Sequence, residues 1–428
     1  MTLPQAVLEI QPVSCPVDAA ISLPGSKSYT NRALIIAAMA RGESLIRSAL
    51  FSDDTDYMVG ALRTLGIPVI QEETSFRVQG AAGRVPASEA TLSVGNAGTA
   101  ARFLTAFLAL GHGRYVLDGN GRMRQRPIQP LLDALTQLGV TARSAEGNGC
   151  PPVIVETTGL SGGEARIPGH ISSQYFSALL MVGPLSQKGL ALQVEGDLVS
   201  KPYTDMTIST MRAFGAEAIN EGYRRFRVPG DQRYAGRTYH VEPDASGASY
   251  FFAAAAVTGG RVRVMHLGRD SAQGDLRFVE LLERMGCIVR REEDYTEVVG
   301  APTLRGIDEN MSDISDTAQT LAAIAPFADS AVTIRGIAHV RGKETDRVTA
   351  MATELRRLGV SVDERRDGLT IHPGPVHPAE IETYDDHRMA MSFAVTGLRA
   401  PGLRIKDPGC VSKTFPDFWQ RFAGLAGP

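Results

Sequence analysis

The stretch Asp346-Arg-Val-Thr-Ala-Met-Ala-Thr-Glu-Leu-Arg-Arg-Leu358-Gly359-Val-Ser-Val362 shows the pattern that decides the fold. A polar start leads into a run with helical periodicity, and a glycine after the last apolar residue is a common helix stop. The β-branched residues after Gly359 are typical of a strand. This stretch is therefore predicted to be a helix that turns at a glycine into a short strand.

The same pattern occurs several times along the chain. The glycines that end the predicted helices are Gly66, Gly139, Gly215, Gly286 and Gly359, at steps of 73, 76, 71 and 73 residues, and a shortened sixth copy ends at Gly424, 65 residues on. Such near-equal steps indicate a repeated α+β unit rather than a chance recurrence. Six units predict two lobes of three units each, with a boundary near Tyr239–Ser246.

The bulk composition limits the function classes. The chain has 428 residues, of which 43% are hydrophobic and 21% charged, as expected of two or three globular domains. A net charge of -3 gives no reason to expect nucleic acid binding. No apolar run is long enough to span a membrane, and the N-terminus lacks the pattern of a signal peptide. Four scattered cysteines and eight histidines without ligand spacing predict a cytoplasmic protein without a metal.

Lysine is rare in this chain. Of its 44 basic residues only six are lysines, so 38 are arginines. A coding bias toward arginine explains most of this imbalance, and such a bias retains lysine where a compact ammonium is needed. Four of the six lysines lie in the polar motifs GSKS, SKPY, GKETDR and SKTF, at Lys27, Lys201, Lys343 and Lys413. These four are therefore candidate site residues.

The stretch Leu23-Pro-Gly-Ser-Lys27-Ser28-Tyr-Thr-Asn-Arg32 runs directly into an apolar helix. Backbone N–H groups at a helix N-terminus attract anions, and two cations flank this one. A phosphate or carboxylate site is one interpretation, and an ordinary capped helix is the other.

Further motifs of this kind follow in the first half of the chain. Val94-Gly-Asn-Ala-Gly98-Thr99 is a glycine-rich loop before a helical run, but it lacks the Walker pattern of nucleotide kinases. Arg126 precedes a proline that suits the first turn of a helix, whereas Arg124 is better explained as a solvated turn residue. The hydroxyl and amide groups of Ser172–Gln174 suit a polyol or a phosphate, or only a helix cap.

The second half has its own charged clusters. Asp316 stands before an apolar run, where it serves as an N-cap or as a base aimed at a substrate hydroxyl. Lys343 and Arg347 share a face if their segment is helical. Arg388 and Lys413 lie in two further polar motifs. Cations in both halves of a slightly acidic protein predict a pair of anionic ligands.

Taken in order, these motifs resemble those of the EPSP synthase family of enolpyruvyl transferases. The resemblance covers essentially the whole chain and rests on LPGSKSYTNRAL, GNAGTAARF, RMRQRPI, SSQY, GDLVSKPY, KETDRVTAMATELRRLG, YDDHRMAMSF and SKTFPDF. It implies an α/β fold, a two-lobed inside-out α/β barrel of six βαβαββ units, three per lobe. The implied lobes are residues 1–26 plus 242–428 and residues 27–241, with the active site in the cleft between them.

The resemblance also implies the reaction, in which the enolpyruvyl group of phosphoenolpyruvate moves to the 5-hydroxyl of shikimate 3-phosphate and phosphate leaves. No cofactor is implied. Asp316 would accept the hydroxyl proton, Glu344 would protonate the methylene carbon, and Lys27 would share this proton transfer. The implied shikimate 3-phosphate ligands are Lys27, Ser28, Arg32, Ser172, Ser173, Gln174, Ser200, Tyr203, Asp316, His339 and Lys343. The implied phosphoenolpyruvate ligands are Lys27, Gly98, Arg126, Arg347, Arg388 and Lys413.

Two positions depart from the family pattern. His339 replaces the usual asparagine, which would make a phosphate contact pH-sensitive, and Phe103 replaces a frequent proline behind the Gly98 loop. We expect glyphosate to inhibit, with Phe103 leaving the degree of inhibition open. We also expect a monomer that closes its lobes around its substrates.

Three other functions compete with this one. A UDP-N-acetylglucosamine enolpyruvyl transferase would carry a reactive cysteine near Arg122–Pro127, where this chain has none. An RNA 3′-phosphate cyclase would need affinity for RNA. A non-catalytic phosphosugar-binding protein would need no Asp316–Glu344 pair.

Overall fold

The structure, a computed structural model, describes residues 7–426. Within it the chain forms two compact units. We call residues 25–241 the central unit, and residues 7–24 together with 242–426 the terminal unit. Each is described by itself.

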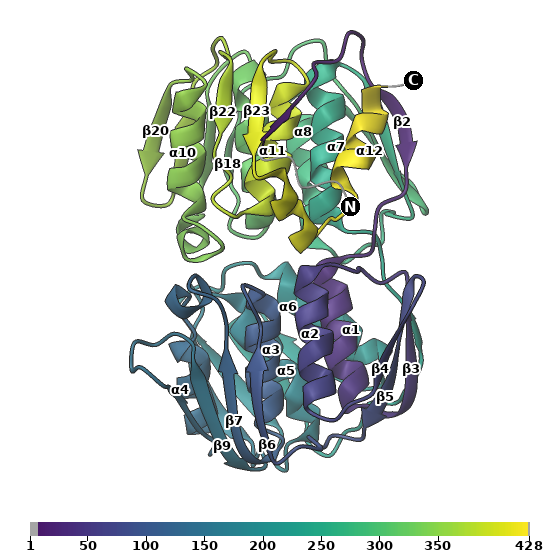
Figure 1. Ribbon diagram of the computed structural model, residues 1–428, viewed down its shortest axis with the longest axis vertical. Helices are drawn as coiled ribbons and strands as arrows, with labels where there is room; N and C mark the ends of the chain where they lie inside the picture. Colours follow the sequence, from purple (N-terminus) through teal and green to yellow (C-terminus); the bar gives the residue numbers. More distant parts are fainter. Residues whose placement is uncertain (1–6, 427–428) are drawn as a thin grey trace. The chain divides into compact units, whose positions relative to one another are not determined.

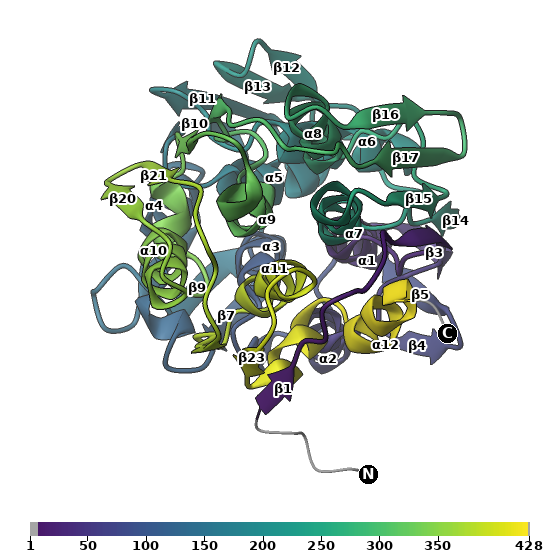
Figure 2. The same ribbon diagram turned by 90° about the horizontal axis from the view of Figure 1, so that it is seen from above.

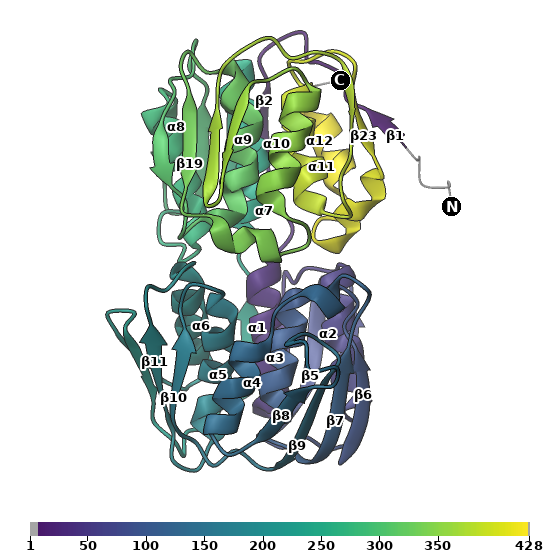
Figure 3. The same ribbon diagram turned by 90° about the vertical axis from the view of Figure 1, so that its left-hand side faces the viewer.

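The central unit contains three four-stranded sheets and six α-helices (Figures 1 and 3). Its helices are α1 (Lys27–Met39), α2 (Asp53–Thr64), α3 (Gly98–Leu108), α4 (Gln129–Gln137), α5 (Ser173–Val182) and α6 (Pro202–Ala213). Its strands are β3 (Arg41–Arg47), β4 (Val69–Glu72), β5 (Ser75–Ala81), β6 (Glu89–Ser93), β7 (His112–Asp118), β8 (Thr141–Ser144), β9 (Val153–Thr158), β10 (Gly163–Pro168), β11 (Leu190–Glu195), β12 (Ile219–Glu221), β13 (Arg225–Val228) and β14 (Thr238–His240).

The terminal unit contains two four-stranded sheets, one three-stranded sheet and six α-helices. Its helices are α7 (Ala245–Thr258), α8 (Phe278–Arg284), α9 (Ala318–Ile324), α10 (Arg347–Arg357), α11 (His387–Gly397) and α12 (Phe418–Ala423). Its strands are β1 (Val7–Glu9), β2 (Asp18–Ile21), β15 (Arg261–Met265), β16 (Ile288–Arg291), β17 (Tyr295–Val299), β18 (Asp308–Asn310), β19 (Val332–Arg335), β20 (Val362–Arg365), β21 (Gly368–Ile371), β22 (Ala379–Ile381) and β23 (Leu403–Lys406).

Each four-stranded sheet is one βαβαββ copy. In the sheet β6-β7-β9-β8, strand β6 pairs parallel with β7 across helix α3, and β9 pairs antiparallel with both β7 and β8. The same order occurs in β10-β11-β13-β12 and in β18-β19-β21-β20. The predicted repeat is therefore confirmed, and so is the fold class.

In two copies the first strand comes from a distant part of the chain. β14, at residues 238–240, pairs parallel with β3 and so completes the copy that contains α1. β2, near the N-terminus, pairs parallel with β15 and completes the copy that contains α7. The chain thus enters the central unit after β2 and leaves it after β14.

The repeat glycines end their helices as the sequence predicts. Gly66, Gly139, Gly215, Gly286 and Gly359 all have φ between 83° and 106°, the left-handed region that favours glycine. Each follows the helix by two residues, as Gly359 follows α10. Gly424 in the shortened sixth copy differs, because it caps α12 with φ -64°. In that copy β1 supplies the third strand of the sheet β1-β23-β22.

The core of each unit is built of helices. α1, α3 and α5 in the central unit, and α7, α9 and α11 in the terminal unit, are buried on almost every side. Figure 2 shows the last three at the centre of the terminal unit, with its sheets around them. A helix that is apolar all round must lie inside. Side chains at the N-terminal ends of these helices are therefore brought close together.

Candidate active site

Three helix starts of the terminal unit meet at Asp316, which precedes α9. Its Oδ1 accepts from Lys343 Nζ at 2.5 Å and from Arg347 Nη1 at 3.2 Å. Its Oδ2 accepts from Arg388 Nη2 at 2.9 Å. Arg347 opens α10 and Arg388 is the second residue of α11. Asp316 is therefore the counter-ion of three cations, and it does not cap a helix.

A second layer of carboxylates surrounds Arg347. Its Nε and Nη2 donate to Asp386 at 2.7 and 3.2 Å, and Nη2 donates to Glu344 Oε2 at 2.8 Å. Asp386 also caps α11 by accepting from the Arg388 backbone N–H at 2.9 Å. Arg347, Glu344 and Asp386 are all buried. The Arg347 guanidinium therefore donates to both predicted proton carriers, Asp316 and Glu344.

The electrostatics of Asp316 follow from these neighbours. Burial alone would raise its pKa, but the charges of Arg388, Lys343 and Arg347 outweigh this and hold the pKa well below the usual range. Burial lowers the pKa of Lys343, and Asp316 opposes that shift. In the absence of substrate Asp316 is a carboxylate whose oxygens are engaged by cations.

Lys343 and Arg347 do not share a helical face, because the helical segment on which that prediction depended does not form. Lys343 follows the short helix η6 (Ala338–Gly342), and α10 begins only at Arg347. Between them lies Asp346, whose side chain caps α10 and pairs with Arg341. Both cations still bind Asp316, Lys343 from the end of η6 and Arg347 from the start of α10.

His339 Nε2 lies 2.9 Å from Ser315 Oγ, next to Asp316. Burial, aided by Lys343, lowers the pKa of His339 to about 3. In the unliganded protein the imidazole is therefore neutral at physiological pH, and the pH sensitivity of a phosphate contact at this position stays a prediction.

The neutral state of His339 predicts a pH dependence of stability. Below pH about 6.5 the unfolded chain takes up a proton here that the folded chain does not, so stability is lost as pH falls toward 3. The His339→Asn variant should lose less stability over pH 6.5 to 4, by at most ~1.4 kcal/mol per pH unit. Urea unfolding at several pH values measures this, with exposed His170→Asn as the control. Parallel stability curves for His339→Asn and the unchanged protein would contradict it.

In the central unit the helix starts also converge. Lys27 is the first residue of α1, and its Nζ lies 3.3 Å from Asp54 Oδ2 at the start of α2. Arg32, one turn further into α1, is buried and donates to Thr207 Oγ1, Ser177 Oγ and the carbonyl of Tyr203. Burial lowers the pKa of Arg32 to about 10. Its guanidinium joins α1 to α5 and α6, and its role as a substrate ligand stays a prediction.

Gly98 and Arg126, both predicted to bind phosphoenolpyruvate, lie close together. Arg126 Nη1 donates to the carbonyl and side-chain oxygens of Asn96 at 3.0 and 3.1 Å. A Cβ added at Gly98 would lie 2.4 Å from Arg126 Nη2. Arg124 instead forms an exposed ion pair with Asp118, as expected of a solvated turn residue.

This close approach predicts the effect of a methyl group at Gly98. Gly98→Ala would displace the Arg126 guanidinium, and we expect the KM for phosphoenolpyruvate to rise about tenfold, equivalent to ~1.4 kcal/mol. Steady-state kinetics measure this, with Gly60→Ala as control because no atom lies within 4 Å of an added Cβ there. An unchanged KM would show that Arg126 keeps its function when displaced.

The hydroxyl residues of the central unit lie at the starts of α5 and α6. Ser172 caps α5 by accepting from the Gln174 backbone N–H, and Gln174 Nε2 donates to Thr99 Oγ1 at 3.3 Å. Ser200 has a left-handed backbone with φ 53° two residues before α6, and Tyr203 lies in the first turn of that helix. Ser172 therefore serves as a cap, and its role as a substrate ligand stays a prediction.

Lys413 ends the short helix η7 (Pro408–Lys413) of the terminal unit. η7 packs against α11, the helix that carries Arg388. Burial raises the pKa of Asp385, which precedes α11, and the charge of Lys413 opposes that rise. Lys413 therefore belongs to the neighbourhood of Arg388.

Several residues that contact the site residues were not predicted from the sequence to do so. Asp386 was visible as part of a charged motif, but nothing in the sequence assigned it to Arg347. Tyr250 Oη accepts from Arg388 Nη1 at 3.2 Å, and no sequence signal marks it. Arg102 and Tyr175 both donate to the carbonyl of Pro127, at 2.6 and 2.7 Å, and so hold the residue after Arg126.

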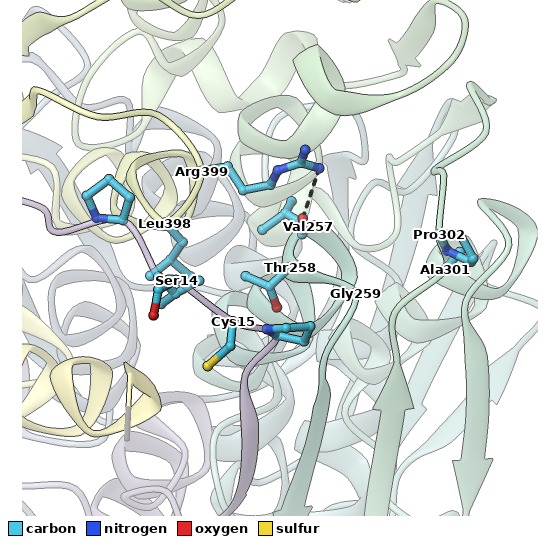
Figure 4. Close-up of a pocket in the computed structure, with 12 residues that line it drawn as sticks. Ser14, Cys15, Val257, Thr258, Gly259, Ala301, Pro302, Leu398 and Arg399 are labelled. Carbon is cyan, nitrogen blue, oxygen red and sulfur yellow. Dashed lines mark hydrogen bonds between the residues drawn. The ribbon is translucent and has the colours of Figure 1, made fainter. Parts of the chain in front are cut away.

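A separate pocket of about 430 Å³ lies at the other end of α7 and α11 (Figure 4). Val257, Thr258, Leu398 and Arg399 line it at the helix C-termini, together with Cys15. Arg399 Nη1 donates to the carbonyl of Val257 at 3.1 Å. The pocket lacks the convergent cations of the helix starts, so the candidate site is not located there.

Among residues 7–426 no His, Cys, Asp and Glu side chains gather in a group able to hold a metal ion. In the same residues, no helix combines the length and the apolar composition that a membrane crossing requires.

This chain is similar in sequence to known proteins over nearly its whole length. The family model described as EPSP synthase (3-phosphoshikimate 1-carboxyvinyltransferase) matches residues 13–422. The chain belongs to the EPSP synthase family. The 3-phosphoshikimate 1-carboxyvinyltransferase of Nostoc punctiforme is 53% identical over 417 residues, which cover 97% of this chain and 98% of that protein. The enzyme of Shewanella amazonensis is 46% identical and covers 98% of this chain and 99% of its own.

Solved structures agree with this membership. EPSP synthase from Acinetobacter baumannii matches with a TM-score of 0.82 at 26% identity, covering 98% of each chain. The enolpyruvyl transferase NikO from Streptomyces tendae, at 19% identity and a TM-score of 0.79, shares the fold. This EPSP synthase family chain is a transferase of the shikimate pathway, and it moves the enolpyruvyl group of phosphoenolpyruvate to the 5-hydroxyl of shikimate 3-phosphate.

A UDP-N-acetylglucosamine enolpyruvyl transferase would carry a reactive cysteine, so the reactivity of the cysteines tests for that activity. Cys15 is exposed, Cys150 half-buried, and Cys287 and Cys410 buried. Burial raises the pKa of Cys150, Cys287 and Cys410, which lowers their reactivity. We expect a maleimide to label Cys15 first and to leave activity unchanged. Mass spectrometry with an activity assay measures this, and Cys15→Ser is the control. Activity loss in proportion to labelling would contradict it.

Proposed function

We propose that the two proton carriers of this enolpyruvyl transfer are Asp316 and Glu344, and that Lys27 shares the proton transfer. Glu344 gives a proton to C3 of phosphoenolpyruvate, and Asp316 takes the proton of the attacking 5-hydroxyl. The new C–O bond at C2 yields a tetrahedral intermediate. Loss of a C3 proton and cleavage of the C2–O bond to phosphate then give the product. An acid and a base of this kind each contribute about 10²–10⁴-fold to the rate.

The observation that carries this proposal is the pairing of Asp316 with Lys343, Arg347 and Arg388. These three cations are also the proposed ligands of the anionic substrates. A bound phosphate or carboxylate would compete with Asp316 for their N–H groups. The positive field on Asp316 would then weaken and its proton affinity would rise, so substrate binding itself would prepare the base.

We propose further that residues of both units bind the substrates. Lys27, Ser28, Arg32, Ser172, Ser173, Gln174, Ser200, Tyr203, Asp316, His339 and Lys343 bind shikimate 3-phosphate, and Lys27, Gly98, Arg126, Arg347, Arg388 and Lys413 bind phosphoenolpyruvate. Helix starts support this, because their N–H groups and dipoles favour anions. Bidentate arginines suit the carboxylate and phosphate of phosphoenolpyruvate. Binding of both substrates would close the units around them, and small-angle scattering with and without the pair tests that closure.

Two variants test the ligand assignment. Ser173→Ala should raise the KM for shikimate 3-phosphate and leave that for phosphoenolpyruvate near its normal value. Arg388→Lys should do the reverse, because a lysine cannot reproduce a bidentate contact. The assignment fails if both variants change the two constants equally or in the opposite sense.

We also propose that glyphosate inhibits by competing with phosphoenolpyruvate. Gly98 has no Cβ, so the Arg126 guanidinium lies close to its backbone, and this cation beside a helix start supports binding of a small anion there. Phe103 is buried on α3, and the Arg32 guanidinium lies 5.2 Å from its ring centroid. Inhibition assays at several phosphoenolpyruvate concentrations test this, and inhibition that stays constant as phosphoenolpyruvate rises would refute it.

We propose, finally, that the chain acts as a cytoplasmic monomer, since all the proposed ligands come from one chain. Light scattering under assay conditions tests the monomer, and the mass of a dimer would contradict it. Cell fractionation tests the location.

A further inference from the structure

The turn that leads into α11 has an unusual backbone. Tyr384 and Asp385 are consecutive and both left-handed, with φ of 55° and 53°. Neither is a glycine, so the Cβ atoms of both disfavour this conformation. Such a turn persists only where its surroundings hold it. It is followed at once by Asp386, which binds Arg347 and caps α11.

Glu354 of α10 accepts two hydrogen bonds from the segment that forms this turn. Its side chain is fully buried. Oε1 accepts from the Tyr384 hydroxyl at 2.6 Å, and Oε2 accepts from the Glu382 backbone N–H at 3.1 Å. Arg357 Nε balances the charge at 2.9 Å. Burial, together with the bond to Glu354, raises the pKa of Tyr384, so its hydroxyl stays protonated and can donate.

Arg347 holds the other end of the same turn. It lies seven residues before Glu354 on α10, which is two turns, so both side chains leave the same face of the helix. Arg347 binds Asp386 through two hydrogen bonds, and Glu354 binds Glu382 and Tyr384. One helix thus fixes the turn at both ends.

We propose that Glu354 and Tyr384 are positioning residues for phosphoenolpyruvate: by holding the left-handed turn they fix Asp386, and through it the guanidinium of Arg347 and the first turn of α11 that carries Arg388. This rests on the proposed assignment of Arg347 and Arg388 to phosphoenolpyruvate. Glu354 lies about 10 Å along the helix axis from Arg347, at 1.5 Å per residue. The pair therefore acts through other residues and does not touch the reacting atoms.

The first test removes only the hydroxyl. Tyr384→Phe should raise the KM for phosphoenolpyruvate about three- to tenfold and leave the KM for shikimate 3-phosphate unchanged. Glu354→Gln, which keeps the shape of the side chain, should act in the same direction. The matched control is Tyr223→Phe, because Tyr223 is also left-handed and donates to a carboxylate, Asp205, at 2.6 Å. This control should leave the KM for phosphoenolpyruvate unchanged.

The second test separates backbone positioning from loss of packing. Tyr384→Gly and Tyr384→Ala both lack the ring and the hydroxyl, but only glycine adopts a left-handed backbone without a Cβ clash. The glycine variant should therefore show a KM for phosphoenolpyruvate closer to that of the unchanged protein than the alanine variant does. Equal constants for the two variants would show that the turn conformation is not what matters.

The outcomes distinguish this inference from the proposed function. If Tyr384→Phe and Glu354→Gln lower the Tm but leave the KM values unchanged, the pair only stabilises the fold, and the inference is overturned. If Arg388→Lys raises the KM for phosphoenolpyruvate in that same series, the proposed function stands and the positioning inference alone fails. If Arg388→Lys has no effect either, both fail.

Discussion

Replacing Glu344 by glutamine should lower kcat by about 10²–10⁴-fold, the usual contribution of a general acid. Glutamine keeps the size of the side chain, and its oxygen can still accept the Arg347 N–H that now lies 2.8 Å from Glu344. The site is therefore expected to keep its geometry and to lose only the proton. KM values should change little, because the interaction lost is one made in the transition state.

A solvent isotope experiment sharpens this first prediction. In D₂O the unchanged enzyme should place deuterium on the enolpyruvyl methylene carbon, since protonation at C3 is reversed during elimination. Glu344→Gln should abolish this exchange together with turnover. Glu280→Gln is the control, because Glu280 is a half-buried residue of α8 that is paired with Arg291 at 3.0 Å and has no proposed role in the site. Near-normal turnover or exchange in Glu344→Gln would assign the acid to another group.

The second large effect concerns stability. Arg347→Met leaves the buried carboxylates of Asp386 and Glu344 without their main cation. Removing one partner of a buried ion pair typically costs ~3–5 kcal/mol, because a charge stays buried without compensation. We expect the terminal unit to lose this much unfolding free energy in denaturant titrations. Arg225→Met, whose pair with Glu164 at 2.9 Å is exposed, should change stability by less than about 1 kcal/mol.

A double variant separates the charge effect from lost packing. Adding Asp386→Asn to Arg347→Met removes one of the two orphaned charges, so part of the lost stability should return. Additive losses in the double variant would show that Asp386 and Arg347 are not coupled, and the description of the buried cluster would then be wrong.

Much of this arrangement could be predicted from the repeat. Asp316 and Arg388 are 72 residues apart, within the 71 to 76 residues that separate the repeat glycines. Equivalent helix starts of successive copies lie at the same end of the unit, so the two residues meet. The glycines that end the helices could also be predicted, in this case from the local sequence, because a left-handed residue after a helix is most often glycine.

Other features depended on contacts that no local pattern encodes. The neutral state of His339 comes from burial beside Lys343, and a single residue type does not reveal burial. The enclosure of Arg32 comes from Ser177 and Thr207, on two helices far along the chain. The bond between Glu354 and Tyr384 lies inside the predicted helix–strand pattern, where Glu354 reads as an ordinary polar residue.

Phosphate release is the most direct measure of the central claim. The purified chain should release phosphate from phosphoenolpyruvate when shikimate 3-phosphate is present, at a rate that saturates with both, and Glu344→Gln should release about 10²–10⁴-fold less per unit time. Release that depends on UDP-N-acetylglucosamine, with none in the presence of shikimate 3-phosphate, would contradict the account.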